Sequence, residues 1–209
     1  ELPREKAQRF QKALEAYGFM QPGGDLWQTI LDLLSEQIAG FYDPESKELY
    51  LIAEHRSEDE PGDGGIDPNA MIAQMLGMDQ NRLVTVHELT HALQDQNFDL
   101  LTLPMGTEDN DDLVTAVKAV VEGEATFVMF DDVAQKMGMG LENIPGIDRM
   151  LDGGGAMPSA PGAEIMDQAP EYLKRNLVFS YIGGLRFVQA VKKAKGWKGV
   201  NALYQDMPA

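Results

Sequence analysis

Two of the chain's three histidines lie four residues apart in the stretch VHELTHALQDQ, with a glutamate directly after the first. On an α-helix, residues i and i+4 share one face, and their Cβ atoms are about 6 Å apart. His87 and His91 can therefore offer imidazole nitrogens to one metal ion. Glu88 would lie beside that ion, where a carboxylate can take a proton from bound water and pass it to a leaving amine. The pattern HExxH thus predicts a zinc-dependent hydrolytic site.

An ordinary amphipathic helix with packed or exposed histidines is the alternative reading of this stretch. Apolar residues cover much of the circumference of the helix, as expected of a helix buried in a core. They include Leu83, Val84, Val86, Leu89 and Leu93. Unpaired polar groups on a buried helix are costly, and a metal ion is an economical partner for them. We therefore expect one zinc ion per chain as the cofactor.

The third ligand is not evident from the motif alone. Catalytic zinc takes three protein ligands and keeps a position for water. The chain has no cysteine, so the third ligand must be His55 or a carboxylate. His55 follows a predicted strand, where an exposed loop histidine is the better reading. Glu122 and Glu124 lie in an otherwise apolar helix and point about 200° apart, so only one of them can face a given ion.

Periodicity leaves the choice between these two glutamates open. It mildly favours Glu124, whose helix face carries larger apolar side chains, namely Val117, Val120, Val121, Phe127 and Val128. Glu122 shares its face with Ala119, Ala125 and Thr126. Small side chains there, with Gly123 beside them, would let this helix closely approach the helix of His87 and His91, which we call the metal helix. On physical grounds the two carboxylates are nearly equal candidates.

The composition predicts one globular domain of 209 residues, with an N-terminal part over 1–98 and a C-terminal part over 99–209. The net charge of −17 argues against a nucleic-acid partner or an anionic membrane surface. No apolar run approaches the roughly 20 residues of a membrane span. The sequence begins at Glu1 without Met, which leaves room for an upstream targeting segment. The compartment stays open, with a secreted or cell-envelope location favoured over the cytoplasm.

Hydrophobic periodicity indicates an α+β, helix-rich chain. The predicted helices cover 3–20, 25–38, 69–77, 80–97, 109–137, 168–194 and 198–206. GFYDPESKELYLIAE predicts one hairpin, with its turn at Asp43-Pro44 and Ser46. An acidic loop is expected over 57–68, and a glycine-rich segment over 153–164 has the composition of a lid. These elements must bring the metal helix and the glutamate helix together.

HELTH followed by a helix bearing EGEA resembles the gluzincins, zincin-fold metallopeptidases whose third zinc ligand is a glutamate. Their aminopeptidase branch carries Glu-Gly-x-Ala at the ligand, which here places Glu122 in the ligand position. The same branch has Tyr-x-x-Gly after the ligand helix, with the tyrosine hydroxyl stabilising the oxyanion. Tyr181 and Gly184 fit that pattern. A tyrosine that only packs in the core is the alternative reading.

Over most of its length the chain also looks like an uncharacterised bacterial family of predicted zinc metallopeptidases. The matching stretches are GFYDPESKELYL, HELTHALQDQ, VEGEAT, YIGGLRFV and GWKGVNALYQDMP. The resemblance implies a zincin-like fold around a central HExxH helix. Two departures stand out: the gap between His91 and Glu122 is longer than in the aminopeptidase branch, and Thr126 stands where many relatives carry aspartate. In such sites a hydrogen-bond partner orients each ligand histidine, and the sequence does not identify that partner here.

These observations lead us to expect a zinc metallopeptidase that acts on a peptide or protein substrate. Glu88 would be the general base, Tyr181 the oxyanion donor, and the edge of the strand at 49–52 a place for an extended peptide to pair. One alternative is a module of the same fold that binds zinc or a protein without turnover. The other is a zinc amidase or esterase, which would use the same residues.

Overall fold

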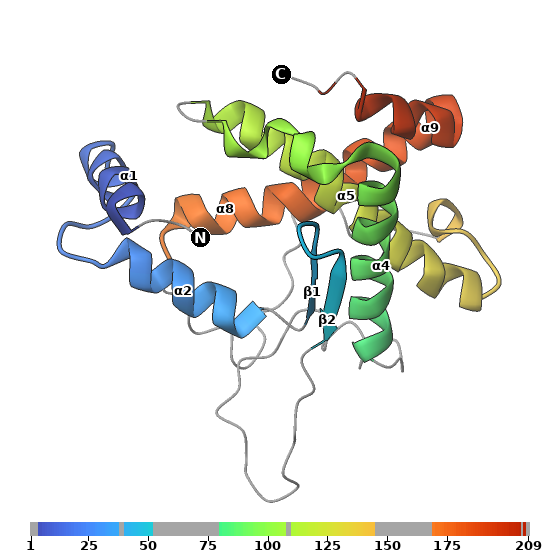
Figure 1. The fold of residues 1–209 in the computed structure, drawn as a ribbon, viewed down its shortest axis with the longest axis horizontal. Helices are drawn as coiled ribbons and strands as arrows, with labels where there is room; N and C mark the ends of the chain where they lie inside the picture. The colour runs from blue at the N-terminus through green and yellow to red at the C-terminus, as the bar shows by residue number, and fades with distance from the viewer. Residues whose placement is uncertain are drawn as a thin grey trace, which may run out of the picture.

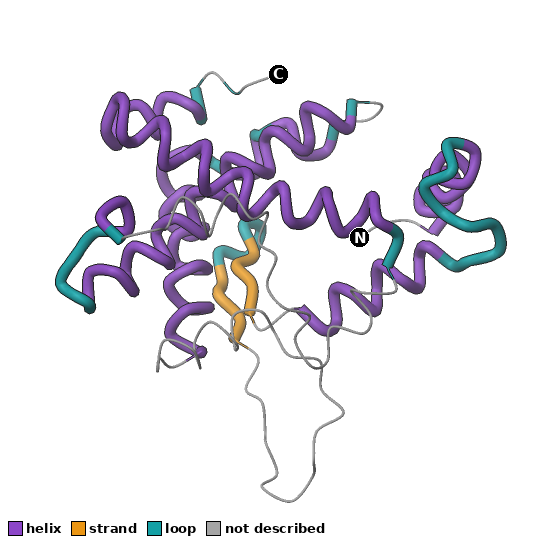
Figure 2. Tube along the Cα trace, turned by 180° about the vertical axis from the view of Figure 1, so that it is seen from behind, coloured by secondary structure: helices purple, strands orange, loops and turns teal. Residues whose placement is uncertain are grey.

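The computed structural model describes residues 4–37, 40–51, 80–107, 110–144, 169–205 and 207. Within these ranges the protein is helix-rich with one small sheet, an α+β arrangement as the sequence predicts (Figures 1 and 2). The helix predicted at 69–77, the loops predicted at 57–68 and 153–164, and His55 all lie outside the described residues.

The hairpin consists of β1 (Gly40–Asp43) and β2 (Glu48–Leu51), paired antiparallel with Tyr42 opposite Leu49. Its turn is the predicted one. The Asp43 carboxylate accepts the N–H of Glu45 and the hydroxyl of Ser46. Lys47 adopts a positive φ of 60°, which lets the chain reverse into β2. The hairpin lies against helix α4 (Gln80–Phe98), as Figure 1 shows.

Helix α5 (Asp111–Lys136) packs along α4 and is the most buried element described. It begins after Asn110, whose side chain accepts the N–H of Leu113. Leu83 of α4 is fully buried against apolar side chains of α5, a contact that fixes the spacing of the two helices. The sequence pattern predicted both helices with nearly these bounds, since each shows sustained apolar periodicity.

The C-terminal region has more breaks than the sequence predicts. The single helix expected over 168–194 is divided into α8 (Glu171–Val178), a π-helical turn η4 (Phe179–Gly183) and α9 (Gly184–Leu203). The break expected between 194 and 198 corresponds to Gly196, whose φ of 65° kinks α9. Short 3₁₀ turns occupy Leu100–Thr102, Pro104–Gly106 and Leu141–Asn143.

The main core lies between α5 and α9, where fully buried apolar side chains meet. Its central members are Phe127, Ala134, Leu141, Leu185, Val188 and Val200. The two helices touch through their backbones at Gly123 and Gly184. A Cβ added to Gly123 would lie 2.6 Å from the Cα of Gly184, closer than any ordinary contact. Gly123 and Ala119 thus allow a close approach to α9, and the expectation that they bring α5 against the metal helix is wrong.

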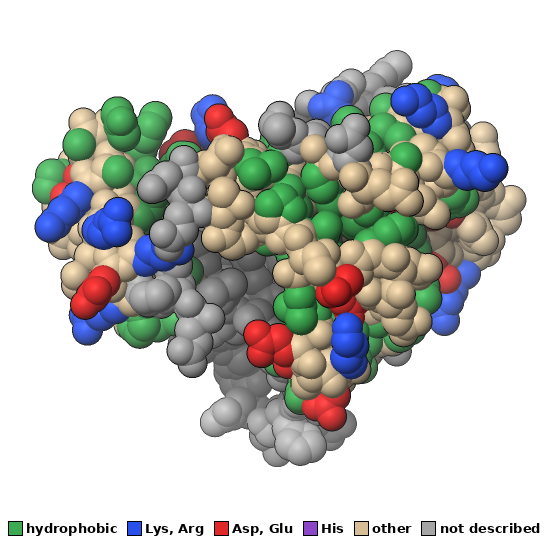
Figure 3. Space-filling view, turned by 45° about the horizontal axis from the view of Figure 1, so that its top comes forward, with side chains coloured by type: hydrophobic (Ala, Val, Ile, Leu, Met, Phe, Trp, Pro, Cys, Tyr) green, Lys and Arg blue, Asp and Glu red, His purple; other side chains and the backbone are tan. Residues whose placement is uncertain are grey.

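Helices α1 (Arg4–Ala16) and α2 (Leu26–Gln37) lie at the end of α8 away from α9 (Figures 1 and 2). The ring of Tyr172 contacts Phe10 and Phe19, with ring centroids 5.6 and 6.1 Å apart. Basic, acidic and apolar side chains occur together over the described part of the face in Figure 3. Among the described residues, no helix combines the length and the apolarity that crossing a membrane requires.

Candidate metal centre

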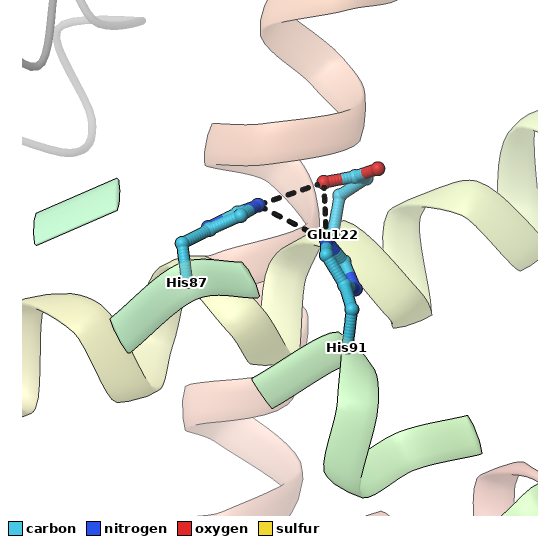
Figure 4. Close-up of side chains that lie close together, drawn as sticks. All are labelled: His87, His91 and Glu122. Carbon is cyan, nitrogen blue, oxygen red and sulfur yellow. Dashed lines mark hydrogen bonds and ion pairs between the residues drawn. The ribbon is translucent and has the colours of Figure 1, made fainter. Parts of the chain in front are cut away.

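Two imidazoles from α4 and one carboxylate from α5 converge on a single point (Figure 4). The Nε2 atoms of His87 and His91 are 3.1 Å apart. The Oε2 atom of Glu122 lies 3.2 Å from Nε2 of His87 and 3.4 Å from Nε2 of His91. Within the part of the chain that the structure describes, this is the one group of three or more such side chains arranged to hold a metal ion.

The separations of these three atoms fit a zinc ion. Zinc with four ligands at about 2.0 to 2.1 Å has its ligand atoms roughly 3.3 Å apart along the edges of a tetrahedron. The observed spacings match one face of that tetrahedron. Two nitrogens and one carboxylate oxygen, without sulfur, form a donor set that catalytic zinc sites use. The residues present therefore fit the ion that the motif predicts.

The charges of the cluster support cation binding. Burial by itself would lower the pKa of His91, but the hydrogen bond and the charge of Glu122 raise it to about 9. Burial would raise the pKa of Glu122, yet its hydrogen bonds to the two histidines hold that pKa well below the usual range. A metal-free cluster thus keeps an ionised carboxylate against a protonated imidazole, and a divalent cation can replace that proton.

Glu88 lies beside the cluster without belonging to it. It is buried, and its Oε2 accepts the backbone N–H of Tyr42 at 2.8 Å. Burial raises the pKa of Glu88, while the charges of His91 and His87 act in the opposite direction. The hairpin therefore holds a buried carboxylate of raised pKa next to the two imidazoles, which is the environment of a general base.

Asp95 fastens the hairpin to the metal helix. Its buried carboxylate accepts the hydroxyl of Tyr42 at 2.8 Å, the ammonium of Lys47 at 2.6 Å and the N–H of Leu100 at 3.0 Å. Burial would raise the pKa of Asp95, but these donors lower it, so the residue stays ionised. This anchor keeps the N–H of Tyr42 in place for Glu88.

Tyr181 reaches the cluster from the π-helical turn η4. Its ring lies nearly parallel to that of His87, with centroids 6.0 Å apart. Burial, followed by the negative charges of Glu122 and Glu88, raises the pKa of Tyr181, so the phenol keeps its proton as a donor. Tyr181 comes three residues before Gly184, where the backbone contact with α5 fixes the position of the turn. Such π turns often occur at functional sites.

Glu124, the alternative ligand, points away from the cluster. Its buried carboxylate accepts the side-chain amide of Gln94 and the hydroxyl of Tyr204. Sequence reasoning left Gln94 without a role, although this amide also contacts His91 at 2.8 Å. The available signal was its position three residues after His91, where helix geometry makes the two side chains neighbours.

The metal helix is less buried than its sequence suggests. Leu83 and Val84 are buried as expected, but Leu89 and Leu93 are 50% and 58% exposed, so the apolar residues of this helix are buried only in part. The Glu122 side chain is itself 26% exposed, so one side of the cluster reaches solvent. An amphipathic helix can therefore carry one buried face toward α5 and one open face beside the site.

Comparisons of the chain with protein-family models, with curated proteins and with solved structures found no match. The candidate metal centre is therefore the structural feature that bears on function. That site combines three ligand atoms suited to zinc, a buried carboxylate of raised pKa and a protonated phenol. Together these groups can bind a metal ion, accept a proton from water and donate a hydrogen bond to a developing oxyanion.

Proposed function

We propose that this protein is a zinc metallopeptidase of the gluzincin type with a zincin-like fold. One zinc ion per chain would be held by His87, His91 and Glu122. The observation that carries the proposal is the triangle of ligand atoms, whose sides of 3.1 to 3.4 Å match a face of a zinc tetrahedron. When bound, zinc supplies a Lewis acid that polarises a carbonyl and makes water a nucleophile at neutral pH.

Glu88 would move the proton in this reaction. Its raised pKa and its fixed position beside the ligands suit a carboxylate that takes a proton from the attacking water. The same carboxyl group would then give that proton to the leaving amine. The hydrogen bond from Tyr42 orients the carboxylate without neutralising it. Tyr181 would donate its hydroxyl hydrogen to the oxygen that becomes negative as the carbonyl is attacked.

The surface beside the site supports a peptide substrate. Exposed apolar side chains lie on the hairpin and on the open face of α4. They are Phe41, Tyr50 and Leu51, which are 41 to 48% exposed, and Leu89 at 50%. An extended peptide that pairs along β2 would place alternate side chains on such a surface. Backbone pairing of this kind gives affinity for peptides in general, and the apolar side chains would favour apolar residues.

Metal analysis combined with single substitutions tests the proposal. The purified protein should contain one zinc per chain, and His87→Ala should lose it. Glu88→Gln should keep the zinc and lower peptide hydrolysis by about 10³-fold or more, the scale expected when a well-placed proton-transfer group is lost. Two controls should behave as wild type: Glu45→Gln on the hairpin turn, and His55→Ala, which removes the alternative histidine ligand.

Each failure has a distinct meaning. A wild-type protein without zinc would overturn the proposal. Stoichiometric zinc without hydrolysis of any peptide, amide or ester would instead indicate a binding module. Turnover of small amides or esters alone would indicate an amidase or esterase.

A further inference from the structure

We propose that Gln94, Glu124 and Tyr204 form a hydrogen-bonded support chain that positions His91 for metal binding. Gln94 is 2% exposed, and its Oε1 lies 2.8 Å from Nδ1 of His91. Its Nε2 lies 3.0 Å from the carbonyl oxygen of Val121 and 3.0 Å from Oε2 of Glu124. The inference rests on the proposed function, because it assumes that His91 is a ligand.

The partners of Gln94 determine which way its amide faces. A carbonyl and a carboxylate can only accept hydrogen bonds, so the end of Gln94 that meets them must be the NH₂ group. The amide oxygen therefore faces His91, and Nδ1 of His91 must donate to it. A neutral His91 then carries its only proton on Nδ1, which leaves the Nε2 lone pair directed at the cluster. Ligand histidines are commonly fixed in this way by a second hydrogen bond.

Glu124 extends the support chain to the end of α9. Its carboxylate is buried and accepts both the Gln94 amide and the Tyr204 hydroxyl. Tyr204 is buried too, with its ring stacked on Phe98 at a centroid distance of 4.2 Å. A buried carboxyl group that loses one of these donors is left with fewer hydrogen-bond partners, which is unfavourable. The last turn of α9 is thus connected to the metal helix through polar groups.

The support chain also provides a partner for a ligand histidine in a protein that has Thr126, and not aspartate, four residues after Glu122. That hydroxyl is buried and has no hydrogen-bond partner, so it does not support a ligand. The structure places that support on α4 itself, three residues after His91. Gln94 touches the ligand and not a substrate, so we assign it as a positioning residue.

Zinc affinity, measured by competition with a chromogenic chelator, tests this role. Gln94→Leu keeps the size of the side chain and should weaken zinc binding by about 10 to 100-fold, the range for loss of a partner behind a ligand. Tyr204→Phe keeps the stacked ring and should weaken binding to a smaller degree. Co²⁺ spectra of both variants should differ from wild type if the imidazole changes its orientation.

Lys47→Met is the matched control. This substitution removes one hydrogen-bond donor from Asp95, a buried carboxylate on α4. Asp95 resembles Glu124 in accepting several hydrogen bonds, but the support chain to His91 does not include it. The substitution should lower thermal stability and leave zinc affinity unchanged. Comparing it with Tyr204→Phe separates a positioning effect from a general loss of stability.

Three results would overturn the inference. If wild type binds no zinc, both the proposed function and the support chain fail. If wild type binds zinc and Gln94→Leu binds it equally well, the metal site stands and the support chain fails alone. If Gln94→Leu does not fold, Tyr204→Phe decides, and wild-type zinc affinity and Co²⁺ spectrum in that variant would refute the role.

Discussion

Replacing Gly184 with alanine should force helix α5, which carries Glu122, away from the start of α9, which directly follows the turn that carries Tyr181. The added Cβ would overlap the carbonyl oxygen of Ala119 and lie 2.9 Å from the Cα of Gly123, whereas ordinary contacts begin at 3.4 Å. Both neighbours are backbone atoms in the middle of α5, which cannot rotate away as a side chain would. The helices must therefore separate or tilt.

The magnitude follows from two opposing terms. Overpacking a well-packed contact typically costs about 1 to 3 kcal/mol, and more when backbone must move. Alanine recovers about 1 kcal/mol over glycine inside a helix. Because backbone atoms must move here, we take a cost of about 3 kcal/mol, which less the gain of about 1 kcal/mol lowers the free energy of unfolding of Gly184→Ala by about 2 kcal/mol. That change corresponds to a fall in Tm of about 4 to 8 °C for a chain of this size. The rate of hydrolysis should fall by more than the loss of folded protein accounts for, because Tyr181 shifts relative to His87.

Denaturant and thermal unfolding, with hydrolysis measured in parallel, check this expectation. Gly106→Ala is the matched control, because its Cβ would meet nothing within 4 Å. It should change stability by less than about 0.5 kcal/mol. A Gly184→Ala protein as stable as wild type or more so, with unchanged activity, would show that helix propensity outweighs the close contact. The account of how Tyr181 is positioned would then be wrong.

Three further outcomes follow from the site. Tyr181→Phe keeps the ring against His87 but removes the hydroxyl, so kcat should fall about 10 to 10³-fold with little change in KM; loss of stability alone would indicate a packing role. Asp95→Ala should destabilise the fold by about 1 to 3 kcal/mol, because it leaves three donors without their acceptor, while zinc is retained; loss of zinc in a folded variant would contradict this reading. In the metal-free protein, the raised pKa of His91 contributes stability that is complete below pH 6.5 and is lost as the pH rises through about 9. The lowered pKa of Glu122 contributes stability that is present above pH 4.5 and is lost as the pH falls into the acid range. Thermal unfolding with a chelator should therefore give the highest Tm between pH 4.5 and 6.5. Zinc affinity should instead increase with pH up to about 9, because binding displaces the His91 proton; a Tm that keeps rising toward pH 9 without metal would refute this assignment.

Local sequence signals predicted the elements that carry the site. The helix of HELTH, the glutamate helix and the hairpin all occur close to their expected bounds. Each depends on contacts between residues near in sequence: apolar periodicity for the helices, and the side chain of Asp43 for the turn. The break expected between 194 and 198 falls at Gly196, where glycine permits the positive φ that the structure shows.

Apolar periodicity predicted less well which side chains of α4 are exposed, because their exposure depends on the elements that pack against this helix. The sequence shows that Leu89 and Leu93 are apolar, but not that they are half exposed to solvent. The π turn was likewise absent from the expectation of one helix over 168–194. It depends on the contact of Gly184 with α5, far away in the sequence.

The sequence by itself determined that two imidazoles share one helix face and that Glu88 lies beside them, because a helix sets both relations locally. It did not determine on physical grounds whether Glu122 or Glu124 joins them, since the two carboxylates point to opposite sides of one apolar helix. Only the packing of α5 between α4 and α9 decided that one carboxylate faces the histidines and the other faces Gln94 and Tyr204. The direction of a helix face is set by what the helix packs against, and that information is distributed over the whole chain.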